Sequence, residues 1–147
     1  MSDPLLLAID CGTQSVRALL FDLRGELRAR AQVPIDSYRS PQPGWMECAP
    51  EAFWQHIGAA CRQLWAGGDS ARDRIAGVVL TTQRAVPVTL DAALQPTRPS
   101  MIWLDQRRAA RAPRLPWWWE AALATIGMRG AVRHFQHEAE ACWMAQH

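Results

Sequence analysis

A turn rich in polar groups follows the first apolar run of the chain, and its residue types suit phosphate and metal binding. The run Leu5 to Ile9 is closed by Asp10, and Gly12, Thr13 and Ser15 follow. The glycine lets the backbone bend closely around an anion, while the turn amides and the two hydroxyls supply donors to phosphate oxygens. The Asp10 carboxylate would repel phosphate unless it holds Mg²⁺, directly or through water. A hairpin turn without a ligand remains the alternative.

A second apolar run, Ile75 to Leu80, is also followed by polar residues, among them Gln83 and Arg84. Ligands of open α/β sheets gather at the carboxyl ends of the strands, so these side chains are well placed to meet one. A guanidinium and an amide can hold adjacent hydroxyls with several directed donors, which is the geometry that a polyol requires. We therefore expect Gln83 and Arg84 to contact a sugar.

Trp103 and Asp105 are the remaining candidates for substrate contact. The indole offers a flat apolar face to the C–H surface of a sugar, and the carboxylate could accept a hydroxyl. A salt bridge from Asp105 to Arg107 or Arg108 is the alternative, and both stay open here. Two further tryptophans, Trp45 and Trp54, are expected to be packing anchors. Glu47 could have no other role than to cap the helix that follows it.

The elements that must position these residues begin with three strands: Leu5 to Ile9, Ser15 to Asp22 and Leu27 to Ile35. The third alternates apolar and polar residues, and tight turns join all three, which predicts an antiparallel meander. Residues 37–50 contain three prolines and are expected to form a loop.

A helix is predicted from Pro50 to about Gly67, since apolar residues recur there at helical spacing and proline suits the first helical position. Ile75 to Leu80 is expected to be a central strand, and Val86 to Leu90 another. The arginines at 107, 108, 111 and 114 are expected on a solvated helix face. A helix that crosses between a meander and a central strand implies a mixed sheet with flanking helices, so the fold class is α/β.

Composition excludes several other functions. The 147 residues, 49% of them hydrophobic, suffice for one domain. Sixteen basic residues against fourteen acidic ones give a net charge of +2, so neither nucleic acid nor a membrane is an expected partner. All sixteen basic residues are arginine, and the absence of lysine excludes a Walker A phosphate loop and a Schiff-base nucleophile.

Four irregularly spaced cysteines, Cys11, Cys48, Cys61 and Cys142, show no zinc-binding pattern and are expected to be free thiols in a reducing compartment. The first ten residues lack the basic region and the apolar length of a signal peptide. We therefore expect a cytoplasmic protein.

Four segments, taken in order, resemble the FGGY family of carbohydrate kinases, which belongs to the actin, hexokinase and Hsp70 ATPase superfamily. Residues 6–22 are similar to the opening hairpin of that family, 43–54 to its loop into the first helix, 82–84 to its substrate-contacting strand end, and 102–107 to its W-x-D-x-R segment. The resemblance implies a ribonuclease H-like (actin-like ATPase) fold. It also implies transfer of a phosphoryl group from ATP, with Mg²⁺, to a sugar or polyol hydroxyl.

On this resemblance, the ATP-binding residues would be Asp10, Gly12, Thr13, Gln14, Ser15 and Arg17, with Asp10 also serving the metal. The sugar would be bound by Gln83, Arg84, Trp103 and Asp105. The glycerol-using branch of the family has a pattern similar to Gln-Arg-Glu at this strand end, whereas this chain has Gln83, Arg84 and Ala85. One hydroxyl acceptor is therefore missing, which argues against glycerol as the substrate. Two alternatives remain: a non-catalytic remnant or binding module derived from such a kinase, and another ATPase of the actin-like superfamily.

We expect residues 1–112 to form the core of the N-terminal kinase domain and 113–147 to be its helical continuation, incomplete at the C-terminus. The family's general base and adenine-binding domain would lie downstream, so the isolated chain is expected to be inactive. The tryptophans at 117, 118 and 119 are consecutive and cannot all face one core. The C-terminal apolar surface is therefore expected to promote poor folding and self-association.

Overall fold

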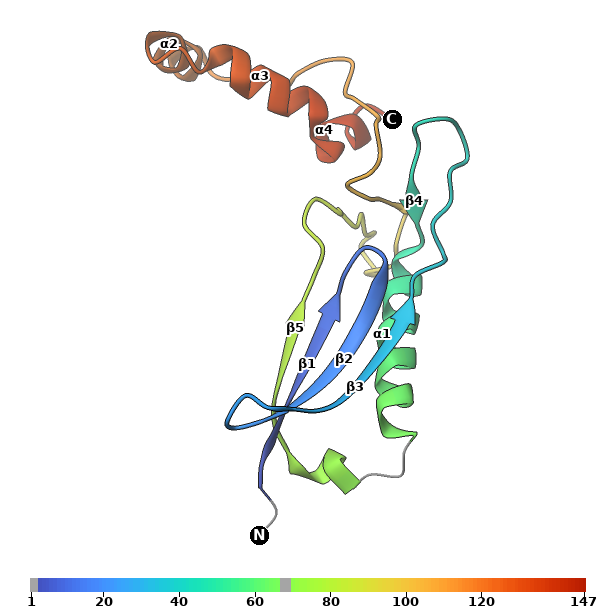
Figure 1. Ribbon diagram of the computed structural model, residues 1–147. Helices are drawn as coiled ribbons and strands as arrows, with labels where there is room; N and C mark the ends of the chain where they lie inside the picture. Colours follow the sequence, from blue (N-terminus) through green and yellow to red (C-terminus); the bar gives the residue numbers. More distant parts are fainter. Residues whose placement is uncertain (1–2, 67–69) are drawn as a thin grey trace.

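A mixed four-stranded sheet forms the centre of the computed structural model, which describes residues 3–66 and 70–147 (Figure 1). Its order is β3-β2-β1-β5. The strands are β1 (Leu5–Cys11), β2 (Ser15–Asp22), β3 (Leu27–Pro34) and β5 (Ile75–Thr81). β1, β2 and β3 pair antiparallel, whereas β5 runs parallel to β1. The predicted meander is therefore confirmed.

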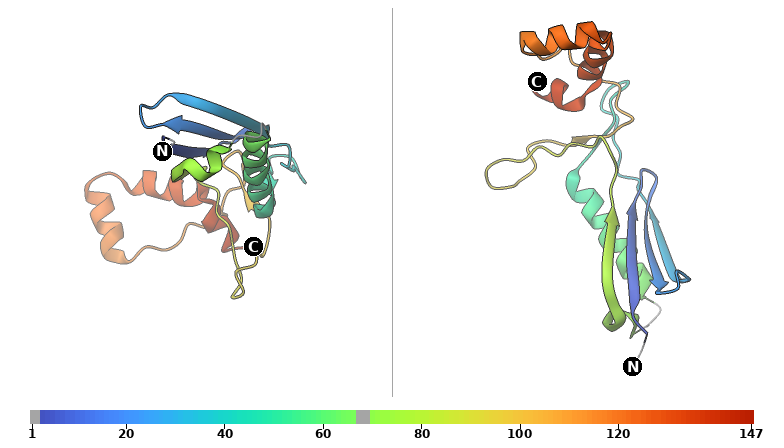
Figure 2. Two further views of the ribbon diagram at one scale, coloured as in Figure 1. Left: turned by 90° about the horizontal axis from the view of Figure 1, so that it is seen from below. Right: turned by 90° about the vertical axis from the view of Figure 1, so that its left-hand side faces the viewer.

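One face of the sheet is covered by helix α1 (Pro50–Trp65), as the edge-on view shows (Figure 2). Pro50 opens the helix, where its missing amide hydrogen costs nothing. Ala60 and Leu64 are buried against Val16, Ala18 and other residues of the sheet, because β2 turns every second side chain towards α1. The expected end near Gly67 lies outside the described residues.

Strand β5 was expected to be central, but it lies at the edge of the described sheet. Helix α1 crosses mainly β2 and β3, so Val78, Val79 and Leu80 of β5 are exposed. The strand expected at Val86 to Leu90 is wrong: only Leu90 forms a bridge, with Pro96. Pro87 explains this, because proline cannot donate to a strand ladder.

The proline-containing loop holds one unpredicted element. β4 (Glu47–Cys48) pairs with β6 (Ser100–Met101) and forms a two-stranded sheet. Residues 102–116 form no helix, so the expected arginine-bearing helix face is wrong. Trp54 is 73% exposed and is not a core anchor, whereas Trp45 is half-buried against Trp143.

Three short helices end the chain and lie beyond the sheet rather than on it (Figure 1). They are α2 (Trp117–Thr125), α3 (Arg129–Glu138) and α4 (Glu140–Met144). The amide of Ala109 donates to the carbonyl of His137 at 2.8 Å, and Trp143 is buried beside Met101 and Ala109. These contacts fix α3 and α4 against residues 101–109.

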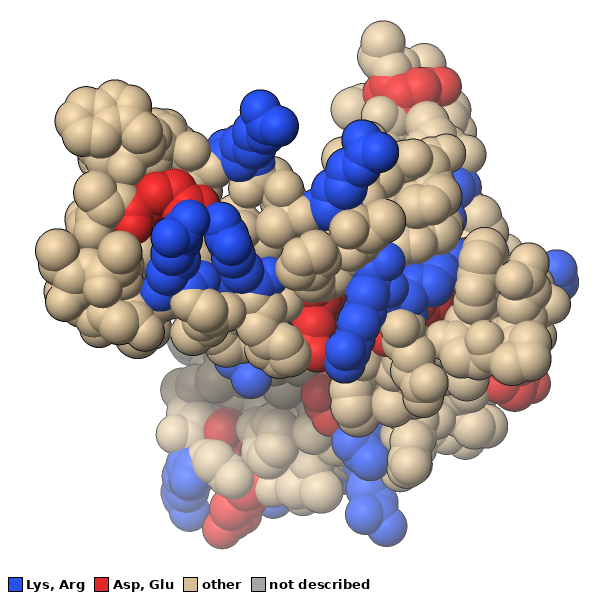
Figure 3. All heavy atoms as spheres, turned by 90° about the horizontal axis from the view of Figure 1, so that it is seen from above, with Lys and Arg blue, Asp and Glu red and all other residues tan. Residues whose placement is uncertain are grey.

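The described chain contains no helix that is both long and apolar enough to cross a bilayer. All four cysteines are free thiols, as expected. On the face seen from above, arginine side chains are interspersed with acidic ones and do not form one basic patch (Figure 3).

Candidate functional site

The two predicted binding motifs line one open pocket of about 650 Å³. Parallel pairing of β1 with β5 brings the carboxyl ends of both strands to the same edge of the sheet. The pocket is lined by Asp10, Cys11, Gly12, Thr13, Thr82, Gln83, Arg84, Ala85 and Trp103. Residues some seventy positions apart in sequence therefore share one site.

Hydrogen bonds join these motifs directly. The indole Nε1 of Trp103 donates to Oγ1 of Thr13 at 2.8 Å, and Nε2 of Gln83 donates to the Gly12 carbonyl at 2.9 Å. The Gln83 Oε1 atom is buried and accepts no hydrogen bond from the described residues. The turn after β1 is thus held from both the strand end and the 102–107 segment.

Tyr38 adds a contact that the sequence did not reveal. Its hydroxyl donates to the Thr13 carbonyl at 2.6 Å and lies 3.4 Å from Nε2 of Gln83. Partial burial raises the pKa of the Tyr38 hydroxyl, so it stays protonated at neutral pH. Tyr38 stands in a proline-containing loop without a recognisable motif, so only the tertiary fold identifies it.

Asp10 lies at the pocket edge between two partners. One carboxylate oxygen accepts from Arg17, its cross-strand neighbour, at 2.9 Å, and the other accepts from Thr81 Oγ1 at 2.9 Å. The described residues include no group of three or more side chains that could hold a metal by themselves. One half-exposed carboxylate beside a phosphate-binding turn nevertheless fits Mg²⁺, which keeps several waters and is usually completed by substrate phosphates.

Three predicted nucleotide-binding residues do not line the pocket. Ser15 is buried, and its hydroxyl accepts from Gln32 Nε2 at 3.1 Å. Arg17 is directed to Asp10, while Gln14 is exposed on the turn. The amides of Thr13 and Gln14 donate to none of the described residues, so the backbone at these positions remains available to an anion.

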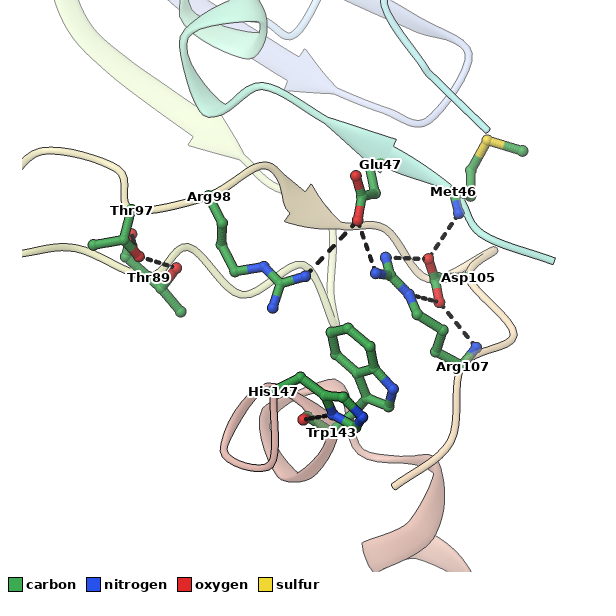
Figure 4. A network of polar contacts seen from close by, with 9 residues as sticks. All are labelled: Met46, Glu47, Thr89, Thr97, Arg98, Asp105, Arg107, Trp143 and His147. Atoms are coloured by element: carbon green, nitrogen blue, oxygen red, sulfur yellow. Dashed lines mark hydrogen bonds and ion pairs between the residues drawn. The ribbon is translucent and has the colours of Figure 1, made fainter. Parts of the chain in front are cut away.

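Asp105 belongs to a buried ion-pair network instead of projecting freely into the pocket (Figure 4). Its carboxylate is 0% exposed and accepts four hydrogen bonds, three from Arg107 and one from the Met46 amide. The structure therefore shows the ion-pair alternative that the sequence left open.

Arg107 is the centre of this network and is only 4% exposed. Its guanidinium lies 2.8 Å from the Glu47 carboxylate, which is thus an ion-pair partner rather than a helix cap. The same guanidinium is flanked by the rings of Trp45 and Trp143, at 3.9 and 4.5 Å from their centroids. Cation–π contact and charge pairing together offset the desolvation of this arginine.

The network lowers the pKa of Asp105. Burial alone would raise that pKa, but the hydrogen bonds and the charge of Arg107, with the Met46 amide, outweigh it. Asp105 therefore stays ionised at neutral pH. It fixes the turn that carries Trp103, since the Asp105 amide also donates to the Ile102 carbonyl.

Asp105→Asn should lower the free energy of unfolding at neutral pH by about 3 kcal/mol, because it leaves Arg107 buried without its charged partner. The pKa of Asp105 is lower in the folded protein than in the unfolded chain. The Asp105 contribution is therefore complete above roughly pH 4 and is lost as the pH falls through the folded pKa. Urea unfolding from about pH 7 to pH 3 should show the wild-type advantage shrinking only at the acid end. Exposed Asp73→Asn is the control, and a pH-independent difference would contradict the assignment.

Comparisons with known proteins identify the family to which the chain belongs. The model of the FGGY family of carbohydrate kinases, N-terminal domain, matches residues 5–117. A glycerol kinase from Rhodospirillum rubrum is 40% identical over 108 residues, covering 73% of this chain and 22% of the relative. A glycerol kinase from Gloeobacter violaceus is 38% identical over 111 residues, covering 75% and 22%. The chain thus spans about a fifth of the length of these relatives.

Solved structures of carbohydrate kinases are also similar to this chain. A xylulose kinase from Brucella ovis has a TM-score of 0.67 and 29% identity, over 86% of this chain and 24% of that one. A xylulose kinase from Rhodospirillum rubrum has a TM-score of 0.64 and 30% identity, over 70% and 21%. The expected ribonuclease H-like (actin-like ATPase) fold is confirmed. Because the family model covers most of its residues, this chain belongs to the FGGY family of carbohydrate kinases and corresponds to its N-terminal domain.

Proposed function

We propose that this chain forms the N-terminal part of an ATP-dependent kinase that phosphorylates a sugar or polyol hydroxyl in the cytoplasm. The observation that carries the proposal is the shared pocket, in which the turn at 10–13 faces the strand end at 82–85 and Trp103. A phosphoryl donor and a hydroxyl acceptor must meet in line, and this arrangement places a candidate subsite for each side by side.

The acceptor side is formed by Arg84, Gln83 and Trp103. Arg84 is exposed and has no ion pair or hydrogen bond to a described residue, so its donors are available to hydroxyls. The Oε1 atom of Gln83 accepts no hydrogen bond from a described residue, but it is buried, so the side chain would have to turn before this atom could accept a hydroxyl. Trp103 is 53% exposed and presents apolar surface to the sugar. Asp105 would act indirectly, by fixing the position of Trp103.

The donor side is formed by Thr13, Gln14 and Asp10. The free amides of Thr13 and Gln14 would hold phosphate oxygens of ATP. Asp10 would hold Mg²⁺ through water, and the bound cation would neutralise charge on the phosphates. Ser15 and Arg17 would contribute indirectly, through the hairpin and through the orientation of Asp10.

The general base would come from another part of the complete kinase. Asp10 is paired with Arg17, and Asp105 is fully buried with a lowered pKa, so neither is suited to take a proton from a sugar hydroxyl. The exposed β5 edge offers unpaired backbone groups and apolar side chains on which further kinase chain could pack.

The isolated 147-residue chain should therefore release no ADP in response to sugar. A coupled assay across pentoses, hexoses and polyols tests this expectation. Sugar-dependent turnover that disappears in Asp10→Ala would show that a complete catalytic site exists within these residues.

Binding can be measured without turnover. Arg84→Ala should raise the dissociation constant for a bound sugar or polyol about tenfold, because directed hydrogen bonds from a charged donor are lost. The chemical shift of the Trp103 indole N–H, in protein with labelled tryptophan, would follow the titration. Exposed Arg30→Ala on β3 is the matched control. Equal affinities for wild type and Arg84→Ala would remove Arg84 from the sugar site.

We further propose that the chain self-associates through the apolar surface of α2 and α3. The tryptophans at 117, 118 and 119 are 81%, 52% and 47% exposed. Ile126 and Phe135 are exposed as well. An uncovered surface of this composition favours contact with a second copy.

Size-exclusion chromatography with light scattering should give a mass that rises with concentration. The double variant Trp117→Ser, Trp118→Ser should remain monomeric, because the exposed indole surface is removed. Trp54→Ser, which removes a 73% exposed indole from α1, should associate like the wild type. A wild-type monomer at all concentrations, with cooperative unfolding, would identify the chain as a self-sufficient domain.

A further inference from the structure

A second hollow, of about 490 Å³, adjoins the candidate sugar site. Trp103 and Ala85 border both spaces. The second hollow is otherwise lined by Asp105, Gln106, Arg107, Arg108, Glu138 and Glu140. A ligand that starts at Arg84 and passes Trp103 would therefore enter a space walled by α3 and α4.

The wall on the α3–α4 side is fixed by polar and aromatic contacts. The amide of Ala109 donates to the His137 carbonyl at 2.8 Å, and Nδ1 of His137 lies 2.7 Å from the Ala109 carbonyl. Trp143 is buried over the Arg107 guanidinium. Glu140 lies one turn before Trp143 on α4, so this docking sets its position.

Most charged groups of the hollow already have partners. Asp105 and Arg107 satisfy each other, and Glu138 lies 2.8 Å from Arg108 and 3.2 Å from His134. Glu140 differs from them: it is half-buried and forms no ion pair or hydrogen bond with a described residue. A partly desolvated carboxylate without a partner has its full accepting capacity available for a ligand.

Ala85 borders both spaces. This residue has a backbone φ of 54°, an unusual value for a residue with a side chain. The conformation is maintained although it is unfavourable, as is common where the backbone borders a ligand.

We propose that Glu140 is a specificity-determining residue that accepts hydroxyls from the part of a sugar or polyol extending past Trp103. The site would then favour acceptors of about five carbons over three-carbon ones. A carboxylate can accept two neighbouring hydroxyls, which suits a polyhydroxylated chain. This inference rests on the proposed function, since it assumes that the first pocket binds the reacting end of the same molecule.

Titrations of the 147-residue chain with xylitol and with glycerol, followed by the Trp103 indole N–H signal, test the inference. Glu140→Gln keeps the size of the side chain and removes its charge. It should raise the dissociation constant for xylitol about tenfold, the effect of losing hydrogen bonds to a charged acceptor, and change that for glycerol less than twofold. Glu51→Gln is the matched control, because Glu51 is an exposed carboxylate on α1 that lines neither hollow.

Three outcomes would overturn the inference in distinguishable ways. If xylitol binding is weakened by Arg84→Ala and unchanged by Glu140→Gln, the proposed sugar site stands and Glu140 is only a solvated charge. If Glu140→Gln weakens xylitol and glycerol equally, the sugar site stands but Glu140 does not discriminate between acceptors by length. If the wild-type chain binds neither polyol, the sugar site itself is contradicted, and the role of Glu140 is lost with it.

Discussion

Parallel pairing of β1 with β5 is the constraint on which the rest of the site depends. The register places Asp10 beside Thr81. Because of this pairing, the turn at 10–13 faces the residues that follow β5. Two hydrogen bonds across this junction, Thr81 to Asp10 and Gln83 to Gly12, join residues 71 positions apart. A parallel pair needs a long crossover, and the loop with helix α1 supplies it. The helix is thus the connection that makes the site possible as well as the cover of the sheet.

The buried charge network provides a second, independent support. Arg107 binds Asp105 and Glu47 and is flanked by two tryptophans, so one side chain holds together the loop before α1, the turn after β6 and helix α4. Such a network stabilises only if every charge in it is paired. It therefore behaves as a unit: its members fix Trp103 and Glu140, and two of them, Asp105 and Arg107, also line the second hollow.

Local pattern was enough to predict the meander, the start of α1 and the two motifs, because alternation and turn chemistry act over a few residues. The pairing of β5 could not be predicted in the same way. A wholly apolar run is compatible with an edge strand or a central strand, and the rest of the sheet decides which strands lie beside it. The apolar content of Val86 to Leu90 favours a strand, but Pro87 cannot donate to a strand ladder and prevents one. Tyr38 and Glu140 carry no motif, so only their tertiary contacts single them out. Asp105 had two chemically reasonable roles, and burial decided between them.

The hydrogen bond from Trp103 to Thr13 affects the electronic character of the turn as well as its shape. A hydroxyl oxygen that accepts from an indole N–H becomes a stronger donor through its own hydrogen, because the two bonds polarise each other. Thr13 is thereby biased towards partners that carry negative charge. A shift of the Trp103 ring by a bound molecule would change this polarisation at Thr13. Occupancy on one side of the pocket would then be sensed on the other without any movement of the backbone.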